Sequence, residues 1–151
     1  MDSLNMSTVK KPQPRNFAVG AVILDRSSNP LKFLVLNRLE NDFMGGIDEL
    51  PSGKVEGKES LKDALKREVR EETSLKIDEI TGYLGSFQYP DSAGNTRRQF
   101  NFAVTVKPAE VKISPVEHAG FQWAGLNDLD NTALTANVKE LINSQAEIFN
   151  N

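Results

Sequence analysis

The chain has 151 residues, a formal net charge of −3 at pH 7 and no cysteine, so it is expected to form one domain without disulfides, thiolate metal sites or a cysteine nucleophile. The acidic balance argues against a nucleic-acid polymer as a partner, because proteins that bind one usually present a basic face. The sequence shows neither a signal peptide nor a membrane-spanning stretch, which predicts a cytoplasmic protein without a membrane partner.

We interpret residues 1–15 as a flexible N-terminal segment, because their prolines disfavour both regular helix and central strand. Residues 16–151 are then expected to form the single domain. Residues 17–24 are a nearly continuous apolar run, which predicts a strand buried on both faces. Residues 31–38 are its expected hairpin partner.

A loop is expected over residues 39–48, which include a Gly-Gly pair. Its Phe43 is a candidate contact for a substrate base, although packing at the rim of the core is the default interpretation of such a side chain. Residues 49–53 then lead into a helix.

An amphipathic helix is predicted from Leu61 to about Thr73. Ser60 followed by Asp63 has the form of a capping box, which places the start of the helix. Helical spacing separates two faces of this segment. The apolar face begins with Leu61, Ala64 and Leu65, and the basic residues on the other side are Lys58, Lys62, Lys66 and Arg70.

The apolar face of this helix continues as carboxylates, at Glu68, Glu71 and Glu72. Like charges at i, i+3 and i+4 destabilise one another, so a bound cation is expected to offset the repulsion. Oxygen ligands without Cys or His suit a hard ion such as Mg²⁺ or Mn²⁺. The alternative is a solvated acidic patch, which would have to explain why the acids continue the buried side.

Gly53, Glu59 and the run Arg-Glu-Val-Arg-Glu-Glu at residues 67–72 belong to a longer pattern that closes at Leu75. This pattern resembles the Nudix box at every signature position except one. Ser74 stands in place of the usual glycine, whose left-handed cap costs a residue with a side chain roughly 1 kcal/mol. Ser52 is a second, smaller departure, because the family usually shows Pro-Gly-Gly before the box.

The resemblance implies a metal site that holds Mg²⁺, with Mn²⁺ as a substitute. The residues it places there are Gly53 through its carbonyl, Glu56, Glu68, Glu71 and Glu72. Glu56 would reach an additional ion, and Arg67 would brace the acidic cluster by pairing with Glu59.

The general base stays open between two places in the chain. Glu71 or Glu72 is the first choice, and Glu117 is the second, because relatives often carry a catalytic or metal-binding acid in this later loop. An ordinary loop acid is the alternative interpretation of Glu117. We interpret the neighbouring His118 as a surface or packing residue rather than a catalyst.

Residues 77–90 and 96–107 flank a good turn and predict a hairpin. Arg97 and Arg98 are candidates for gripping the phosphate or base of a substrate, but strand alternation lets only one of them face a cleft. A short strand over 120–124 and a closing helix over 133–149 complete the chain; this helix carries Leu134, Val138, Leu141 and Ile142 on one face.

This order of elements predicts an α+β fold. The resemblance implies a Nudix-like α/β/α sandwich, with a mixed, curved sheet between the box helix and the C-terminal helix. It also implies hydrolysis of a nucleoside diphosphate linked to another group. Our first hypothesis is a (deoxy)nucleoside triphosphate pyrophosphatase that releases NMP and pyrophosphate. The alternatives are an ADP-ribose or dinucleotide pyrophosphatase and a non-catalytic nucleotide-binding module, and a homodimer stays open.

Overall fold

The structure is a computed structural model that describes residues 16–41 and 45–149. The predicted N-terminal segment, residues 1–15, and Phe43 lie outside the described residues. The strands are β1 (Phe17–Asp25), β2 (Lys32–Arg38), β3 (Asp48–Glu49), β4 (Ser52–Lys54), β5 (Ile77–Pro90), β6 (Thr96–Val106) and β7 (His118–Gly125). The helices are α1 (Leu61–Thr73) and α2 (Ala136–Ser144), with 3₁₀ turns at Leu126–Asn131 and Ala146–Phe149.

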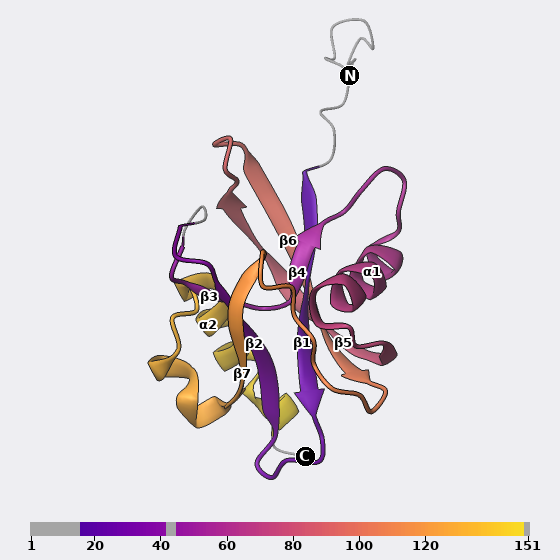
Figure 1. Cartoon of the computed structure of the whole chain (residues 1–151), viewed down its shortest axis with the longest axis vertical. Helices are drawn as coiled ribbons and strands as arrows, with labels where there is room; N and C mark the ends of the chain where they lie inside the picture. Colours follow the sequence, from indigo (N-terminus) through magenta and orange to yellow (C-terminus); the bar gives the residue numbers. More distant parts are fainter. Residues whose placement is uncertain (1–15, 42–44, 150–151) are drawn as a thin grey trace, which may run out of the picture.

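One mixed sheet runs through the molecule in the order β3-β2-β1-β6-β5 (Figure 1). β5 and β6 form the predicted antiparallel hairpin, and β6 lies parallel to β1. The other edge of β1 is shared, because β4 pairs with its first half at Ala18–Gly20 and β2 pairs with its end at Leu24 and Asp25. This division opens the sheet where β1 passes from one partner to the other.

The two faces of the sheet carry separate hydrophobic cores, and this confirms the predicted sandwich. Val19 and Ile23 of β1 pack on the α1 side with Leu65 and Val69. Val22, from the same strand, packs on the α2 side in the cluster that holds the apolar residues of that helix. Because successive side chains of a strand point to opposite faces, a continuous apolar run such as 17–24 is what a strand covered on both sides requires.

The box helix α1 begins and ends where the sequence predicts. The Ser60 hydroxyl accepts a hydrogen bond from the Asp63 N–H at 3.0 Å and caps the first turn. At the other end Ser74 has φ 64° and ψ 7°, the left-handed conformation, and its N–H donates to the Arg70 carbonyl at 2.9 Å. Ser74 therefore adopts the cap geometry that usually falls to glycine.

The predicted C-terminal helix over 133–149 is wrong at both ends. Asp48 donates its N–H to the Ala133 carbonyl and its carboxylate accepts the Ala133 N–H, so this backbone is bound to β3 and cannot be helical. Helix α2 starts after Thr135 and stops at Ser144, where the chain turns into 3₁₀ geometry.

Three strand features differ from the prediction. β7 starts at His118 rather than at residue 120, which moves this histidine from a loop into a strand. The sequence predicts no strand at β3 or β4: Asp48 closes the expected loop over 39–48, and residues 49–53 are the expected connection into the helix. Within residues 16–41 and 45–149, no helix is long and apolar enough to cross a membrane.

Replacing Ser74 by glycine is expected to leave the protein about 1 kcal/mol more stable than replacing it by alanine. Both substitutions remove the hydrogen bond from the Ser74 hydroxyl to the Lys112 carbonyl, but only glycine relieves the left-handed backbone. Chemical denaturation of the two variants measures the difference. At the exposed Lys66 in the middle of α1 the same pair of substitutions should give the opposite order. Equal stabilities at position 74 would contradict the cap.

Candidate active site

A close approach of β4 to α1 forms the base of the site. β4 pairs with β1 through Gly53 opposite Val19, and the carboxylate of Glu68 lies against the Gly53 backbone. A Cβ atom at Gly53 would overlap all the carboxylate atoms of Glu68. The missing side chain at Gly53 therefore lets the Glu68 carboxylate lie beside the backbone of β4, and a larger residue would displace that carboxylate.

Arg67 gathers the acids around the start of the site. Its Nε donates to Glu59 at 2.7 Å, and its Nη1 donates to Glu68 at 2.7 Å and to Glu71 at 3.0 Å. Its Nη2 reaches the Lys54 carbonyl at 2.9 Å, which fixes the guanidinium against β4. The expected contact between Arg67 and Glu59 is present.

The pKa values of Glu59 and Glu68 are shifted in opposite directions. The hydrogen bond from Arg67 lowers the pKa of Glu59 to about 2. Burial raises the pKa of Glu68, although Arg67 opposes that shift. Arg67 thus compensates the negative charge of Glu59, Glu68 and Glu71, and this offsets part of the repulsion that the sequence predicts.

Glu72 lies deeper and lacks an arginine partner in the described part of the chain. Its side chain is 13% exposed and accepts a hydrogen bond from the Ser52 N–H at 2.7 Å. Burial raises its pKa from the ordinary 4.5 to about 9, and the nearby charges of Glu49, Glu68 and Glu117 add to the shift. The acid with the largest desolvation cost therefore faces other acids.

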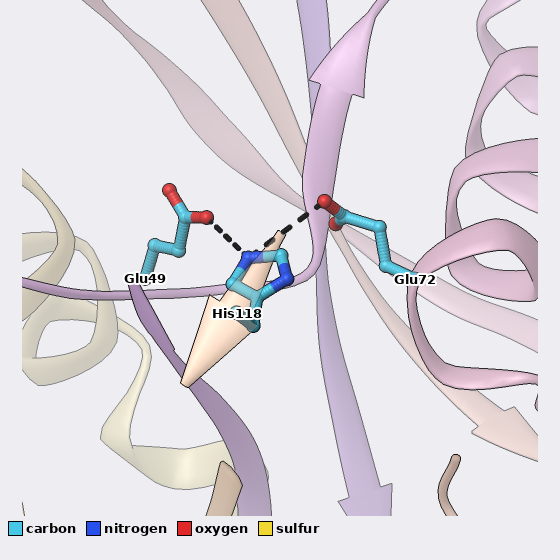
Figure 2. Close-up of side chains that lie close together, drawn as sticks. All are labelled: Glu49, Glu72 and His118. Atoms are coloured by element: carbon cyan, nitrogen blue, oxygen red, sulfur yellow. Dashed lines mark hydrogen bonds and ion pairs between the residues drawn. The ribbon is translucent and has the colours of Figure 1, made fainter. Parts of the chain in front are cut away.

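Glu49 of β3 and His118 of β7 face Glu72 of α1 (Figure 2). His118 Nε2 lies 2.7 Å from a Glu49 oxygen and 3.9 Å from a Glu72 oxygen. The other Glu49 oxygen accepts from Arg38 Nη1 at 3.2 Å. One ligand atom from each of Glu49, Glu72 and His118 lies within 4.8 Å of the others, so this group has the compactness of a metal site.

The surroundings of His118 indicate that it holds Glu49 by a hydrogen bond rather than binding a metal ion. The imidazole is only 3% exposed, and Nδ1 has no hydrogen-bond partner among the described residues. A metal on Nε2 would move the proton to Nδ1, where it would be buried without an acceptor, whereas metal-bound histidines normally donate that proton. If the proton is instead on Nε2 and is donated to Glu49, the imidazole has no unpaired donor. The carboxylates of Glu49 and Glu72 and the Gly53 carbonyl are then the atoms that suit a hard cation.

The remaining predicted residues lie around this centre. Glu71 is 59% exposed and forms an ion pair with Arg67. The prediction that Glu71 continues the buried face of α1 is therefore wrong. Glu56 is 68% exposed, with an oxygen 4.0 Å from Arg67 Nη2. Glu117 is exposed in the turn before β7, close enough for its charge to act on Glu72. Of the two interpretations of His118, surface or packing residue, the structure excludes the first, because pairing of β7 with β2 buries it.

A cavity of about 620 Å³ opens beside Glu72, within the range of small-molecule sites. One end is formed by β3, β4 and α1 and includes Glu49, Gly53 and Glu72. The other end lies between β5, β6 and the start of α2, with Phe87, Tyr89, Arg97, Gln99 and Val138 among its lining residues. The cavity thus combines acidic side chains with aromatic rings, which suits a ligand with a charged and a planar part.

Only one of the two candidate arginines faces this cavity. Arg97 lines it, held by Asn16 Oδ1 at 2.9 Å and by Asp91 at 3.5 Å. Arg98 is not among the lining residues and donates to the Ser86 hydroxyl at 2.7 Å. Strand alternation therefore keeps Arg97 as a substrate-binding candidate and removes Arg98.

The family model described as the NUDIX domain matches residues 14–145 of the chain. The chain belongs to the Nudix family. This Nudix protein is a hydrolase of phosphorus anhydride bonds, a class that uses divalent metal ions, and the acids beside the cavity are of the kind that hold such ions. No curated protein sequence matches the chain significantly.

Solved structures of Nudix proteins share the fold. The MutT protein from Methanosarcina mazei Go1 is 28% identical, with a TM-score of 0.74 over 93% of this chain and 96% of that chain. A C. elegans Ap4A hydrolase is 23% identical, with a TM-score of 0.72 over 87% and 96%. The NUDIX domain of Shewanella oneidensis NrtR, complexed with ADP ribose, is 19% identical, with a TM-score of 0.71 over 93% and 96%.

Glu49 is a candidate site residue that the sequence did not predict. It sits in a short strand whose two residues pair with Leu36 and Asn37, and such a short pairing leaves no periodic signal. The position of Glu49 just before the box was the available signal. His118 was noticed but placed on the wrong side of a strand boundary.

In metal-free protein, stability is expected to fall as the pH rises from about 4.5 to about 9. Over that window the folded state keeps the Glu72 proton that the unfolded chain has lost, so folding binds a proton and becomes less favourable with rising pH. Glu72→Gln removes this dependence and should stabilise the metal-free protein by a few kcal/mol at pH 8.

Urea denaturation in EDTA across this pH range measures the effect. Glu110→Gln, at an exposed loop position, is the control and should keep the wild-type profile. An E72Q profile that runs parallel to wild type would show that burial of Glu72 costs nothing.

Proposed function

We propose that this Nudix hydrolase is an Mg²⁺-dependent pyrophosphatase of nucleoside diphosphates linked to another group. The first candidates are (deoxy)nucleoside triphosphates, cleaved to NMP and pyrophosphate. The observation that carries the proposal is the cavity, which joins the half-buried Glu72 at one end to Phe87 and Tyr89 at the other. A nucleotide fits this polarity, with its phosphates among the acids through a metal and its base beside the rings.

The proposed metal ligands are those of the box. They are Glu68, Glu71, Glu72 and the Gly53 carbonyl, with Glu56 for an additional ion and Glu49 as a newly found neighbour. Their fit rests on the uncompensated burial of Glu72 and on the oxygen donors around it. When bound, Mg²⁺, or Mn²⁺ in its place, would neutralise phosphate charge and lower the pKa of an attacking water.

The chain's own groups orient the reactants around that centre. Arg67 keeps Glu68 and Glu71 in place through short hydrogen bonds, and His118 holds Glu49 toward Glu72. Glu71, Glu72 and Glu117 are retained as candidates for the group that takes the proton of the attacking water. Arg97 faces the cavity and is positioned to contact phosphate or base.

An ADP-ribose or dinucleotide pyrophosphatase is the second candidate. Pro90 supports it, because it lines the cavity next to Asp91, about where ADP-ribose-cleaving relatives carry a proline. A NUDIX domain complexed with ADP ribose also shares the fold. We also propose a cytoplasmic location, and a homodimer stays open.

Purified protein with Mg²⁺ is expected to hydrolyse at least one nucleoside triphosphate to NMP and pyrophosphate, when screened beside ADP-ribose and dinucleoside polyphosphates. Product analysis by ion-exchange chromatography identifies the bond that is cleaved. Release of AMP and ribose phosphate from ADP-ribose alone would replace the first candidate by the second. No product from any of these compounds would refute the proposed function.

Glu72→Gln and Glu71→Gln should each lower turnover by at least about tenfold, because they delete metal-binding charge at nearly constant volume. Lys62→Gln, on the exposed basic side of α1, is the matched control and should keep wild-type turnover. Full activity in E72Q would remove that residue from the site.

Mg²⁺ should stabilise the wild-type fold, because it binds the folded site and not the unfolded chain. At a hundredfold excess over its dissociation constant the gain is roughly 2.7 kcal/mol for one site, a few degrees in melting temperature. The triple variant E68Q/E71Q/E72Q should lose this response. Thermal unfolding with EDTA and with Mg²⁺ at matched ionic strength provides the test, and equal shifts in both proteins would place the metal elsewhere.

A further inference from the structure

Two amide side chains, Gln99 and Asn101, lie buried on one face of β6, beneath the cavity. Asn101 is fully enclosed and Gln99 is 6% exposed, and Gln99 alone of the two lines the cavity. Gln99 Nε2 donates to Asn101 Oδ1 at 2.8 Å. No step of the proposed hydrolysis uses this pair, so its polarity calls for a separate explanation.

Backbone carbonyls determine which way each amide points. Asn101 Nδ2 donates to the carbonyls of Gly85 and Gln99, both at 3.2 Å. A carbonyl can only accept, so the nitrogen of Asn101 must face these groups and its oxygen must face Gln99. That oxygen in turn requires a donor, so Gln99 must present Nε2 to Asn101. The orientation of Gln99 is therefore locked from below.

Glycines on both neighbouring strands contact this arrangement in different ways. A Cβ atom at Gly20 of β1 would overlap Gln99 Nε2 and Asn101 Oδ1. Gly85 of β5, whose carbonyl accepts from Asn101, has φ 116°, a region that disfavours other residues, and sits at an irregularity of the β5–β6 register. The amide pair thus occupies space that Gly20 leaves open and is bound to the backbone at Gly85.

The locked orientation leaves Gln99 Oε1 as an acceptor for the cavity. Oε1 receives no hydrogen bond from the residues that the structure describes, and it is not among their fully enclosed polar atoms. Phe87 is the register partner of Gln99 on β5, and its ring lies 6.1 Å from that of Tyr89. The acceptor therefore sits at the aromatic end of the cavity, beside rings on which a base can stack.

We propose that Gln99 Oε1 accepts a hydrogen bond from the exocyclic amine of a nucleobase, so that the enzyme selects nucleotides of adenine, guanine or cytosine. An amine projects beyond its ring and reaches a recessed oxygen. A ring N–H of uracil or hypoxanthine is flanked by carbonyl oxygen, which Gln99 cannot satisfy because Nε2 is turned to Asn101. This inference rests on the proposed function and names the substrate class of the same site.

The test measures binding of nucleoside monophosphates by calorimetry in saturating Mg²⁺. Each amine-bearing nucleotide is compared with the analogue in which hydrogen replaces the amine: AMP with purine riboside monophosphate, GMP with IMP, and CMP with 2-pyrimidinone riboside monophosphate. Wild type should bind the amine-bearing member of at least one pair about tenfold more tightly. Gln99→Met, which keeps the volume and removes the acceptor, should bring that ratio to about one.

Gln122→Met, at an exposed position on β7, is the matched control and should keep the wild-type ratio. A wild type that does not distinguish the members of any pair would overturn the inference, independently of whether Q99M folds. A ratio that Q99M leaves unchanged would also overturn it. A fourth pair, AMP with 2′-deoxy-AMP, separates base from sugar: sensitivity of only this pair to Q99M would assign the acceptor to a ribose hydroxyl and overturn the inference.

Monophosphates contain no anhydride bond, so this experiment does not depend on catalysis. Failure of the nucleotide screen with intact amine selectivity would count against the proposed function alone. Hydrolysis without amine selectivity would count against the role of Gln99 alone.

Discussion

The contact of Gly53 with the Glu68 carboxylate is the constraint on which the site depends. A side chain at position 53 would displace the Glu68 carboxylate from the backbone of β4, the strand whose Ser52 N–H donates to Glu72. β4 is in turn held to the first half of β1, so the sheet fixes the strand on which this contact is made. The acids of α1 can form a site here because β4 has no Cβ atom at Gly53 and can lie against them.

Charge is balanced unevenly across this contact. Arg67 serves Glu59, Glu68 and Glu71 on the outer side, where each ion pair is partly open to water. Among the residues that the structure describes, Glu72 has only a backbone N–H and the Glu49–His118 pair at its inner side. The fold thus bears a desolvation cost at one carboxylate, which a cation entering the cavity would offset. A binding site that costs stability when empty is a common property of functional sites.

The sequence predicts most of the fold because its strongest signals are local. Helix α1 has a capping serine and a clear apolar stripe, and the continuous apolar run of β1 anticipates cover on both faces. The misses depend on contacts distant in sequence. Asp48 stops the C-terminal helix from starting at Ala133, and pairing with β2 buries His118. Glu49 is positioned by the pairing of β3 with β2 and by the bonds of the preceding Asp48, and no local sequence pattern encodes these contacts.

The bond between Asp48 and Ala133 also has a mechanical consequence. Asp48 joins β3 to the segment before α2 by two hydrogen bonds and itself accepts a hydrogen bond from Asn37, so the two walls of the cavity are linked at this residue. Glu49 follows Asp48 directly in the chain. The segment that leads into α2 and the strand that carries Glu49 are therefore fastened to each other, and both line the same cavity.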